Sequence, residues 1–348
     1  MMNKRTLISL LLLSGVCIFQ ACETDFDPYI PSNPTPVVYG IINPDDSLYQ
    51  IRLTKSFVGP GSAYDYAQIQ DSIYYPEARV YLETYLHNNT LLESVELELV
   101  EIEQREAGIF ASLPNYVYQT DVSQISLRPE HFIDKGIPYN AYLHLRAIIP
   151  GFRDTLFAET RLKQAPKIIN PRANFQKVYF YSEVPFQMEW THTLQDNYFE
   201  IQVILEYREI LEDGEREAVV DWVLKGIEYN EESIPGGRNN FYIYYFRAEH
   251  FYSQLRAAIK VDPEVKGRVV RNVDFVILTS DQTVNNYISI GEIADDYRGS
   301  SYSNVTNGHG IFTAFNTSGV YDLHLGYREL DSLAFGRYTK HLNFKNWE

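Results

Sequence analysis

The 348-residue sequence has only two cysteines, Cys17 and Cys22, and both lie near its start. If Cys17 leaves with an export signal and Cys22 is modified, the folded part has no thiol. It can then hold no disulfide framework, no thiolate zinc site and no cysteine nucleophile. Basic residues are also scarce, because 30 Lys and Arg face 46 Asp and Glu and the formal net charge is −16. We therefore expect no nucleic-acid binding, since a phosphate backbone needs a basic face.

Short catalytic motifs are missing as well. The sequence has no Gly-x-Ser-x-Gly elbow, phosphate loop, His-Glu-x-x-His or EF-hand loop, and no two of its eight histidines are three or four residues apart. We therefore predict no enzyme activity, no catalytic residue, no metal and no cofactor. Three alternatives stay open: His309 and His324 meeting across strands, calcium held by Asp45-Asp46 or Asp295-Asp296, and a carboxylate pair for glycoside hydrolysis.

The start of the chain predicts an export signal over residues 1–21. Lys4 and Arg5 precede an apolar stretch that is too short to cross the roughly 30 Å hydrocarbon core of a membrane. Ala21 stands directly before Cys22, and Phe19-Gln20-Ala21-Cys22 resembles the lipobox of bacterial lipoproteins. The resemblance implies that Cys22 is the first mature residue and carries acyl chains that anchor it to a membrane. An ordinary signal peptide with an incidental cysteine is the alternative.

Residues 22–36 predict a tether between the lipid and the folded part. Glu23, Asp25 and Asp27 follow the cysteine closely and resemble the signal that sends Bacteroidota lipoproteins to the cell surface. A solvated acidic linker on a periplasm-facing protein is the alternative. The four prolines of "PYIPSNPTP" predict an extended, semi-rigid stalk. We expect an outer-membrane protein that is lipid-anchored and faces the cell exterior.

The rest of the chain predicts a mainly all-β protein. Segments such as "LYQIRLTKSF" and "YLHLRAII" alternate apolar and polar residues, and turn residues separate them. Short alternating segments of this kind are typical of antiparallel sandwiches. A basic, proline-containing stretch at 161–177 predicts a boundary between two β-sandwich domains, over residues 37–165 and 170–340.

Several finer features are predicted within these domains. The strand "FQMEWT" followed by "NYFEIQVILEY" resembles the centre of a fibronectin type III or immunoglobulin-like domain, and Asp213-Gly214 predicts a hairpin. "RAEHFYSQLRAAIK" places Tyr252 and Leu255 at helical spacing, which predicts one short helix in the second domain. In the first domain, the alternation of "SVELELVEIE" slips near Val100 and predicts a β-bulge.

The most distinctive stretch is "SYSNVTNGHGIFTAFN", residues 301–316. Its turn residues predict a binding loop or a tight structural loop before a buried strand, and they are Asn304, Asn307, Gly308 and Gly310. With "PVVYGIIN" and "YYPEARVYL" nearer the start, this motif resembles a family of uncharacterised Bacteroidota outer-membrane lipoproteins, from whose pattern His309 and Thr313 depart.

Members of that family are often encoded beside TonB-dependent transporters and have no assigned reaction. The resemblance therefore implies an accessory or binding subunit of a nutrient uptake system, with a TonB-dependent outer-membrane transporter as its partner. A fimbrial or adhesion subunit, in which strands are donated between protomers, is the alternative. A surface glycosidase is the third function considered.

Overall fold

The computed structural model of the protein describes residues 34–56, 62–102, 114–136, 141–173, 177–181, 183–191, 198–228, 241–287 and 302–347. The predicted signal, Cys22 and the three acids after it lie outside this part of the chain. Within it, no helix combines the length and apolar character needed to cross a membrane.

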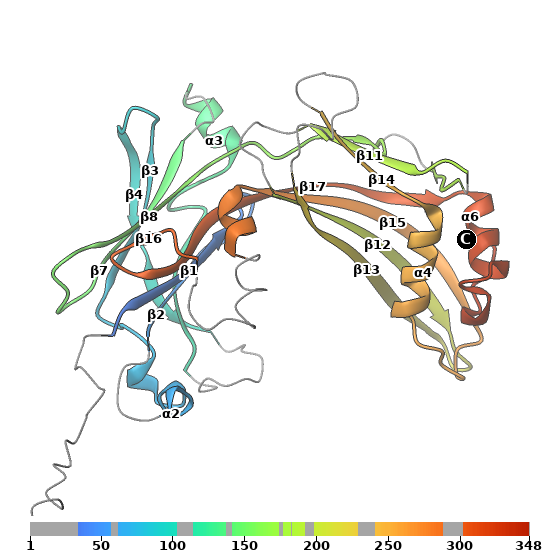
Figure 1. Cartoon of the computed structure of the whole chain (residues 1–348), viewed down its shortest axis with the longest axis horizontal. Helices are drawn as coiled ribbons and strands as arrows, with labels where there is room; N and C mark the ends of the chain where they lie inside the picture. The colour runs from blue at the N-terminus through green and yellow to red at the C-terminus, as the bar shows by residue number, and fades with distance from the viewer. Residues whose placement is uncertain are drawn as a thin grey trace, which may run out of the picture.

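The described residues form an all-β fold of sandwich type, built mainly from antiparallel sheets (Figure 1). The largest sheet has nine strands and runs the length of the molecule. In spatial order its strands are β13 (Glu215–Glu228), β12 (Tyr198–Ile210), β15 (Gly267–Ser280), β17 (His309–Leu325), β1 (Pro36–Ile42), β2 (Leu48–Lys55), β6 (Tyr116–Asp121) and β5 (Glu98–Glu101), with β10 (Lys177–Val178) paired to β17.

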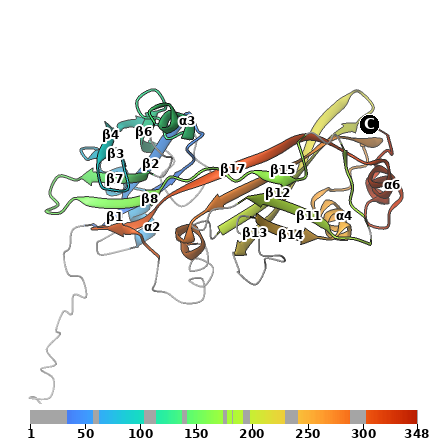
Figure 2. The same cartoon turned by 90° about the horizontal axis from the view of Figure 1, so that it is seen from above.

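Two smaller sheets lie at opposite ends of the long one (Figures 1 and 2). The five-stranded sheet has the order β16 (Val305–Thr306), β8 (Leu156–Arg161), β7 (Tyr142–Ile148), β3 (Arg79–Tyr85) and β4 (Leu91–Glu96). The three-stranded sheet has the order β14 (Phe241–Phe246), β11 (Phe186–Thr191) and β9 (Ile168–Asn170).

Each end therefore has its own hydrophobic core. The N-terminal core includes Ile51 from the long sheet and Leu82 and Leu145 from the five-stranded sheet, all fully buried. The C-terminal core includes Trp190 of β11, whose ring centroid lies 5.4 Å from that of Phe199 in β12. Burial of such side chains is the main favourable contribution to folding.

Strand β17 takes part in both cores. Its first six residues pair in parallel with β1, from Val37↔His309 to Ile42↔Ala314. Residues 315–320 and Leu323 pair antiparallel with β15, and His324 and Leu325 pair in parallel with β10. The structure differs here from the predicted C-terminal domain at 170–340, because Val305, Phe312 and Ala314 belong to the N-terminal core. A parallel partner returns only after a long crossover, so local alternation could not reveal this pairing.

The helical content of the C-terminal end also differs from the prediction. The predicted helix is confirmed as α4 (Ala248–Ala258), which buries Phe251, Tyr252 and Leu255. A second helix, α6 (Tyr327–Phe335), closes the end of the sandwich, and residues 282–287 are helical too. Prediction missed α6 because it is short and only Leu330 and Leu333 mark its apolar face. The other helices that the structure describes are α2 (Ala63–Ala67), α3 (Pro129–Asp134), η2 (Gln70–Ser72) and η4 (Lys340–Leu342).

Two turn predictions had different outcomes. The hairpin at Asp213-Gly214 is confirmed, because it joins β12 to β13 and the Leu211 N–H donates to the Gly214 carbonyl at 2.8 Å. The predicted bulge near Val100 is wrong. At Leu97 the chain passes from β4, which pairs with β3, to β5, which pairs with β6 in the other sheet. The slip in alternation marks this change of sheet.

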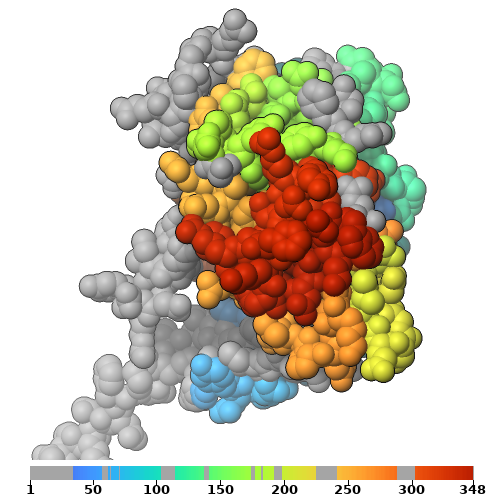
Figure 3. All heavy atoms as spheres, turned by 90° about the vertical axis from the view of Figure 1, so that its right-hand side faces the viewer, coloured from blue at the N-terminus to red at the C-terminus, as the bar shows by residue number. Residues whose placement is uncertain are grey.

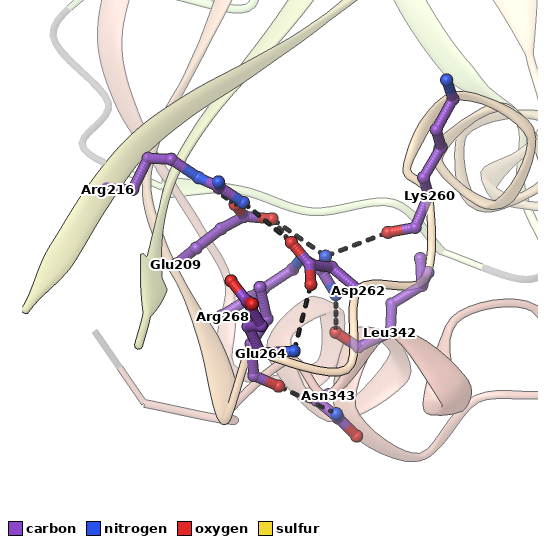
Figure 4. A network of polar contacts seen from close by, with 9 residues as sticks. Glu209, Arg216, Lys260, Asp262, Glu264, Arg268, Leu342 and Asn343 are labelled. Atoms are coloured by element: carbon purple, nitrogen blue, oxygen red, sulfur yellow. Dashed lines mark hydrogen bonds and ion pairs between the residues drawn. The ribbon is translucent and has the colours of Figure 1, made fainter. Parts of the chain in front are cut away.

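A buried ion-pair network holds the C-terminal segment against the long sheet (Figure 4). Arg268 of β15 is 2 % exposed, and its guanidinium contacts the Glu209 carboxylate of β12 at 2.9 Å. It also donates to the carbonyls of Leu342 at 2.5 Å and Lys260 at 3.1 Å. Arg216 pairs with the second oxygen of Glu209 and with Asp262. Glu209 and Arg268, although buried, thus both have several polar partners within this network.

We expect Arg268→Met to lower the free energy of unfolding by about 3–5 kcal/mol, because it leaves the buried Oε1 atom of Glu209 and two carbonyls without their donor. Arg271→Met is the matched control on the same strand. Its ion pair with Glu217 spans 2.9 Å but is 53 % and 63 % exposed, so a loss below about 1 kcal/mol is expected. Urea denaturation measures both variants, and equal losses would contradict the role given to Arg268.

Candidate functional site

A cavity of about 450 Å³ lies at the C-terminal end of the molecule. Its lining comes from α4, from α6 and the turn after it, and from the segment around Phe180. Figure 3 views this end, with the residues of α6 and the C-terminal segment in red at the centre and those around 177–191 in light green above them. The cavity therefore joins three stretches that are far apart in the sequence.

Backbone contacts at the start of α6 fix the geometry of this cavity. The Gly326 N–H donates to the Val178 carbonyl, and the Phe180 N–H donates to Glu329 Oε1, both at 2.9 Å. A Cβ on Gly326 would overlap the Tyr179 ring and the Glu329 carboxylate, so only glycine permits this close approach. These two hydrogen bonds hold helix α6 against Val178 and the residues that follow β10.

Glu329 is a charged residue type in an almost fully buried position. Glu329 is 2 % exposed, and its Oε2 atom has no hydrogen-bond partner among the described residues. Burial raises the pKa of this carboxyl above its usual 4.5, although the backbone N–H groups of Phe180 and Glu329 and the charge of Arg328 act in the opposite direction. A buried carboxyl oxygen that has no hydrogen-bond partner lowers the stability of the fold.

Tyr252 of α4 brings a second unpaired polar atom to the same place. The residue is 7 % exposed, and its hydroxyl has no partner with hydrogen-bond geometry. Burial raises the pKa of this phenol, the nearby Ser332 hydroxyl opposes the shift, and the charge of Glu329 adds to it. The Ser332 hydroxyl itself donates to the Arg328 carbonyl at 2.8 Å. Glu329 and Tyr252 therefore both line the cavity and each keep one buried polar atom without a partner, and we call these two residues the polar floor.

The rim of the cavity is charged and open to water. Arg337 pairs with Glu249 at 2.8 Å, and these side chains are 70 % and 55 % exposed. The Arg337 guanidinium also lies 4.7 Å from the centroid of the Tyr338 ring. Arg328 is exposed at the same rim. Because water and salt screen exposed charges, the rim ions influence a ligand less than an equal charge on the polar floor would.

The predicted loop residues have structural roles. The Asn304 side chain makes two hydrogen bonds to the Phe312 backbone, at 2.7 and 2.9 Å, and Asn307 donates to the Thr155 carbonyl at 2.9 Å. Asn307 adopts φ 61° and Gly310 φ 111°. A Cβ on Gly310 would overlap the Val38 carbonyl oxygen, and one on Gly308 would lie 2.9 Å from the Pro36 carbonyl oxygen. The two glycines let β17 lie against β1, Asn304 holds the backbone of β17, and Asn307 ties the turn to Thr155.

The remaining sequence candidates do not meet at a site. His309 and His324 lie at opposite ends of β17, about 50 Å apart for fifteen residues of extended strand, so the alternative in which they meet across strands is wrong. In the part of the chain that the structure describes, no cluster of three or more His, Cys, Asp or Glu could hold a metal. Asp295-Asp296, Cys22, Glu23, Asp25 and Asp27 lie outside that part.

Sequence reasoning missed the polar floor. In the sequence, Tyr252 belongs to an apolar helix face and Glu329 is one acid among many. A buried glutamate at the third position of a helix whose N-cap is Gly326 gives a weak sequence signal. Its partner is the Phe180 backbone, 149 residues away, and only the fold reveals that contact.

The fold and the cavity define an all-β sandwich protein with a ligand-sized cavity at one end. No family model matches the chain. No curated protein matches it. Among solved structures, the calcium-binding domain CBD12 of CALX1.1 is similar over 80 % of this chain and 98 % of that chain, at 9 % identity and a TM-score of 0.17. So low a score carries no argument about this protein.

We expect Gly310→Ala to destabilise the protein by several kcal/mol, on the order of 3 or more, because it combines backbone strain with overlap against β1. Gly151→Ala is the matched control. Gly151 also has positive φ, at 85°, but a Cβ there would meet nothing within 4 Å, so a loss of about 1 kcal/mol is expected. Denaturation curves that show equal losses would reject the close-approach explanation.

We expect the stability of the protein to fall, relative to the Glu329→Gln variant, as the pH rises above 4.5, the usual pKa of a glutamate carboxyl. A carboxyl whose folded-state pKa is raised contributes stability below its unfolded pKa and loses it as the pH rises through the folded value. Gln cannot ionise and keeps the acceptor for the Phe180 N–H. Urea denaturation across this pH range measures the difference. The exposed control Glu183→Gln should run parallel to wild type, and a parallel Glu329→Gln curve would contradict the expectation.

Proposed function

We propose that the protein is a lipid-anchored outer-membrane lipoprotein whose folded part binds a ligand at the cell surface, as an accessory subunit of a TonB-dependent uptake system. The observation that carries the binding role is the cavity of about 450 Å³ with the polar floor of Glu329 and Tyr252. Ligand sites are typically concave, largely apolar and supplied with a few polar groups, as this cavity is. The anchor and the uptake role rest on the sequence around Cys22 and on the family resemblance.

The arrangement of the two ends supports this proposal. The first described residues lead into β1 in the N-terminal sandwich, and the cavity lies at the far end of the C-terminal sandwich (Figure 1). A chain held by lipid at Cys22 would thus keep its anchor and its cavity at opposite ends. A binding subunit benefits from that separation, because its ligand then meets the cavity away from the lipid.

The cavity favours binding over a glycosidase. Hydrolysis of a glycosidic bond needs two carboxyl groups that face each other across the substrate. Two of the glutamates in the lining are engaged, Glu249 by Arg337 and one oxygen of Glu329 by the Phe180 N–H. A fimbrial or adhesion subunit remains an alternative from the sequence, and no observation on the described residues favours it.

We expect wild-type protein in the outer-membrane fraction, sensitive to protease on intact cells and recovered with an outer-membrane transporter in mild detergent. Cys22→Ser should move it to the soluble fraction, because the acyl chains that hold it are lost. Cys17→Ser is the matched control and should change nothing. Fractionation with metabolic acyl labelling measures the outcome. Label retained in Cys22→Ser would contradict the anchor, and recovery without a transporter would contradict the uptake role.

A further inference from the structure

We infer that the free edge of strand β13 binds an extended segment of another protein as an additional strand, and that this segment carries Lys or Arg at alternate positions. The inference goes beyond the proposed ligand binding. It rests on the edge of the long sheet and uses neither the cavity nor the lipid anchor.

Strand β13 leaves a long row of backbone groups without a strand beside it. Among the described residues it pairs with β12 alone and stands last in the order of the long sheet (Figure 1). It spans 14 residues, whereas β5 at the other end of that sheet spans 4. The N–H and C=O groups of such an edge are a template for a further strand, because they lack partners within the sheet.

The hairpin before β13 determines which of its backbone groups face outward. The Leu211 N–H donates to the Gly214 carbonyl, so these two residues form a hydrogen-bonded pair. Such pairs alternate with non-bonded pairs along an antiparallel ladder. In the register of β12 with β13, the even-numbered residues from Arg216 to Trp222 therefore bond to β12. The N–H and C=O groups of residues 217, 219 and 221 face away from the sheet.

Strand β13 lacks most of the features that prevent pairing at a free edge. Its residues 215–224 contain no proline, and their register with β12 has no bulge. Proline, bulges and short length are common means of preventing such pairing, and so are charged side chains. The core side holds the strand in place, since the Trp222 ring lies 5.1 Å from that of Phe246 and 6.3 Å from that of Phe251. Charge is therefore the remaining barrier at this edge.

The charges beside the edge determine which strand it accepts. Glu217, Val219 and Asp221 are exposed, and Val219 reaches 61 %. Glu217 pairs with Arg271 at 2.9 Å. Partial burial and the charge of Glu200 raise the pKa of the Asp221 carboxyl, and no cation of the described residues opposes that shift. A strand with a basic residue opposite Asp221 supplies the missing positive charge, because opposite charges on facing strands attract.

The same acids disfavour a second copy of this chain as the occupant. An antiparallel pair of β13 strands centred on Val219 would twice place Glu217 opposite Asp221 of the second copy, and facing like charges are destabilising. The predicted tether, residues 22–36, suits the edge no better. It is acidic, and its four prolines cannot donate to a ladder. The occupant that fits is a basic segment of a different protein.

The first test compares two peptides of opposite charge. They are acetyl-Thr-Lys-Thr-Val-Thr-Lys-Thr-amide and the same peptide with Glu in place of Lys, and each reads the same in both directions. Fluorescence anisotropy of the labelled peptides measures binding to the full acylated chain in a neutral detergent, with empty micelles as reference. At low salt the Lys peptide should bind about tenfold or more tightly than the Glu peptide. Equal affinities, or no binding of the Lys peptide, would overturn the inference.

The second test separates strand addition from simple attraction between charges. N-methyl groups on the two lysines and the valine keep the charges of the Lys peptide but remove the donors that face β13, so binding should weaken about tenfold or more. Val219→Pro removes an outward N–H and should weaken binding of the Lys peptide by about the same factor. Val219→Ala is the matched control that keeps this N–H, and it should change binding less than about threefold. Unchanged binding of the methylated peptide, or equal binding by the two variants, would reject strand addition.

The third test locates the charge. Asp221→Asn should weaken binding of the Lys peptide several-fold, on the order of a lost ion pair. Glu212→Gln makes the same charge change at the hairpin turn, where the side chain is 91 % exposed, and should alter binding less than about twofold. Equal effects of the two variants would mean general attraction by an acidic protein and reject the edge.

Folding and self-association complete the test. A denaturation curve checks each variant, and if Val219→Pro does not fold, the methylated peptide carries the backbone test. Sedimentation equilibrium in detergent should give one chain per particle for the wild-type protein. A wild-type dimer that becomes a monomer in Val219→Pro would show that a second copy occupies the edge and would overturn the inference.

Discussion

The close parallel approach of β17 to β1 is the constraint on which the rest of the structure depends. Gly310 lies where the Val38 carbonyl leaves no room for a side chain, and the Asn304 amide holds the Phe312 backbone beside it. The same strand then continues for eleven residues into the other sandwich and pairs with β15. Both hydrophobic cores use β17, so the two ends of the molecule share one element and fold as coupled parts.

The C-terminal end has a second set of contacts between residues that are far apart in the sequence. Arg268 binds Glu209 and the Leu342 carbonyl, and Glu329 binds the Phe180 N–H. The Arg268–Leu342 and Glu329–Phe180 contacts join the last residues of the chain to β15 and to the segment that follows β10. The cavity exists because α6 is held in place by these contacts at its two flanks. The cavity therefore forms only when the C-terminal residues are in place. A helix held by hydrogen bonds sets its geometry more than flexible loops do.

The sequence predicted the all-β class, the hairpin at Asp213-Gly214 and helix α4, because each depends on alternation or spacing within about fifteen residues. It did not predict the β1–β17 pairing or the change of sheet at Leu97, since both depend on partners far along the chain. The same limit applies to the site. The four loop residues stand out by type and make the close contacts at the start of β17, whereas Glu329 and Tyr252 have a distinctive environment only after folding.

The polar floor lowers the stability of the folded protein. Two buried atoms without partners cost about 2–6 kcal/mol together, which is a large part of a typical stability of about 5–15 kcal/mol. Leu330 and Leu333 of the same helix show that apolar residues fit this interface well. A leucine at position 329 would remove the carboxyl but also the acceptor of the Phe180 N–H. That bond explains one oxygen of Glu329, and it leaves the second oxygen and the Tyr252 hydroxyl without a structural reason.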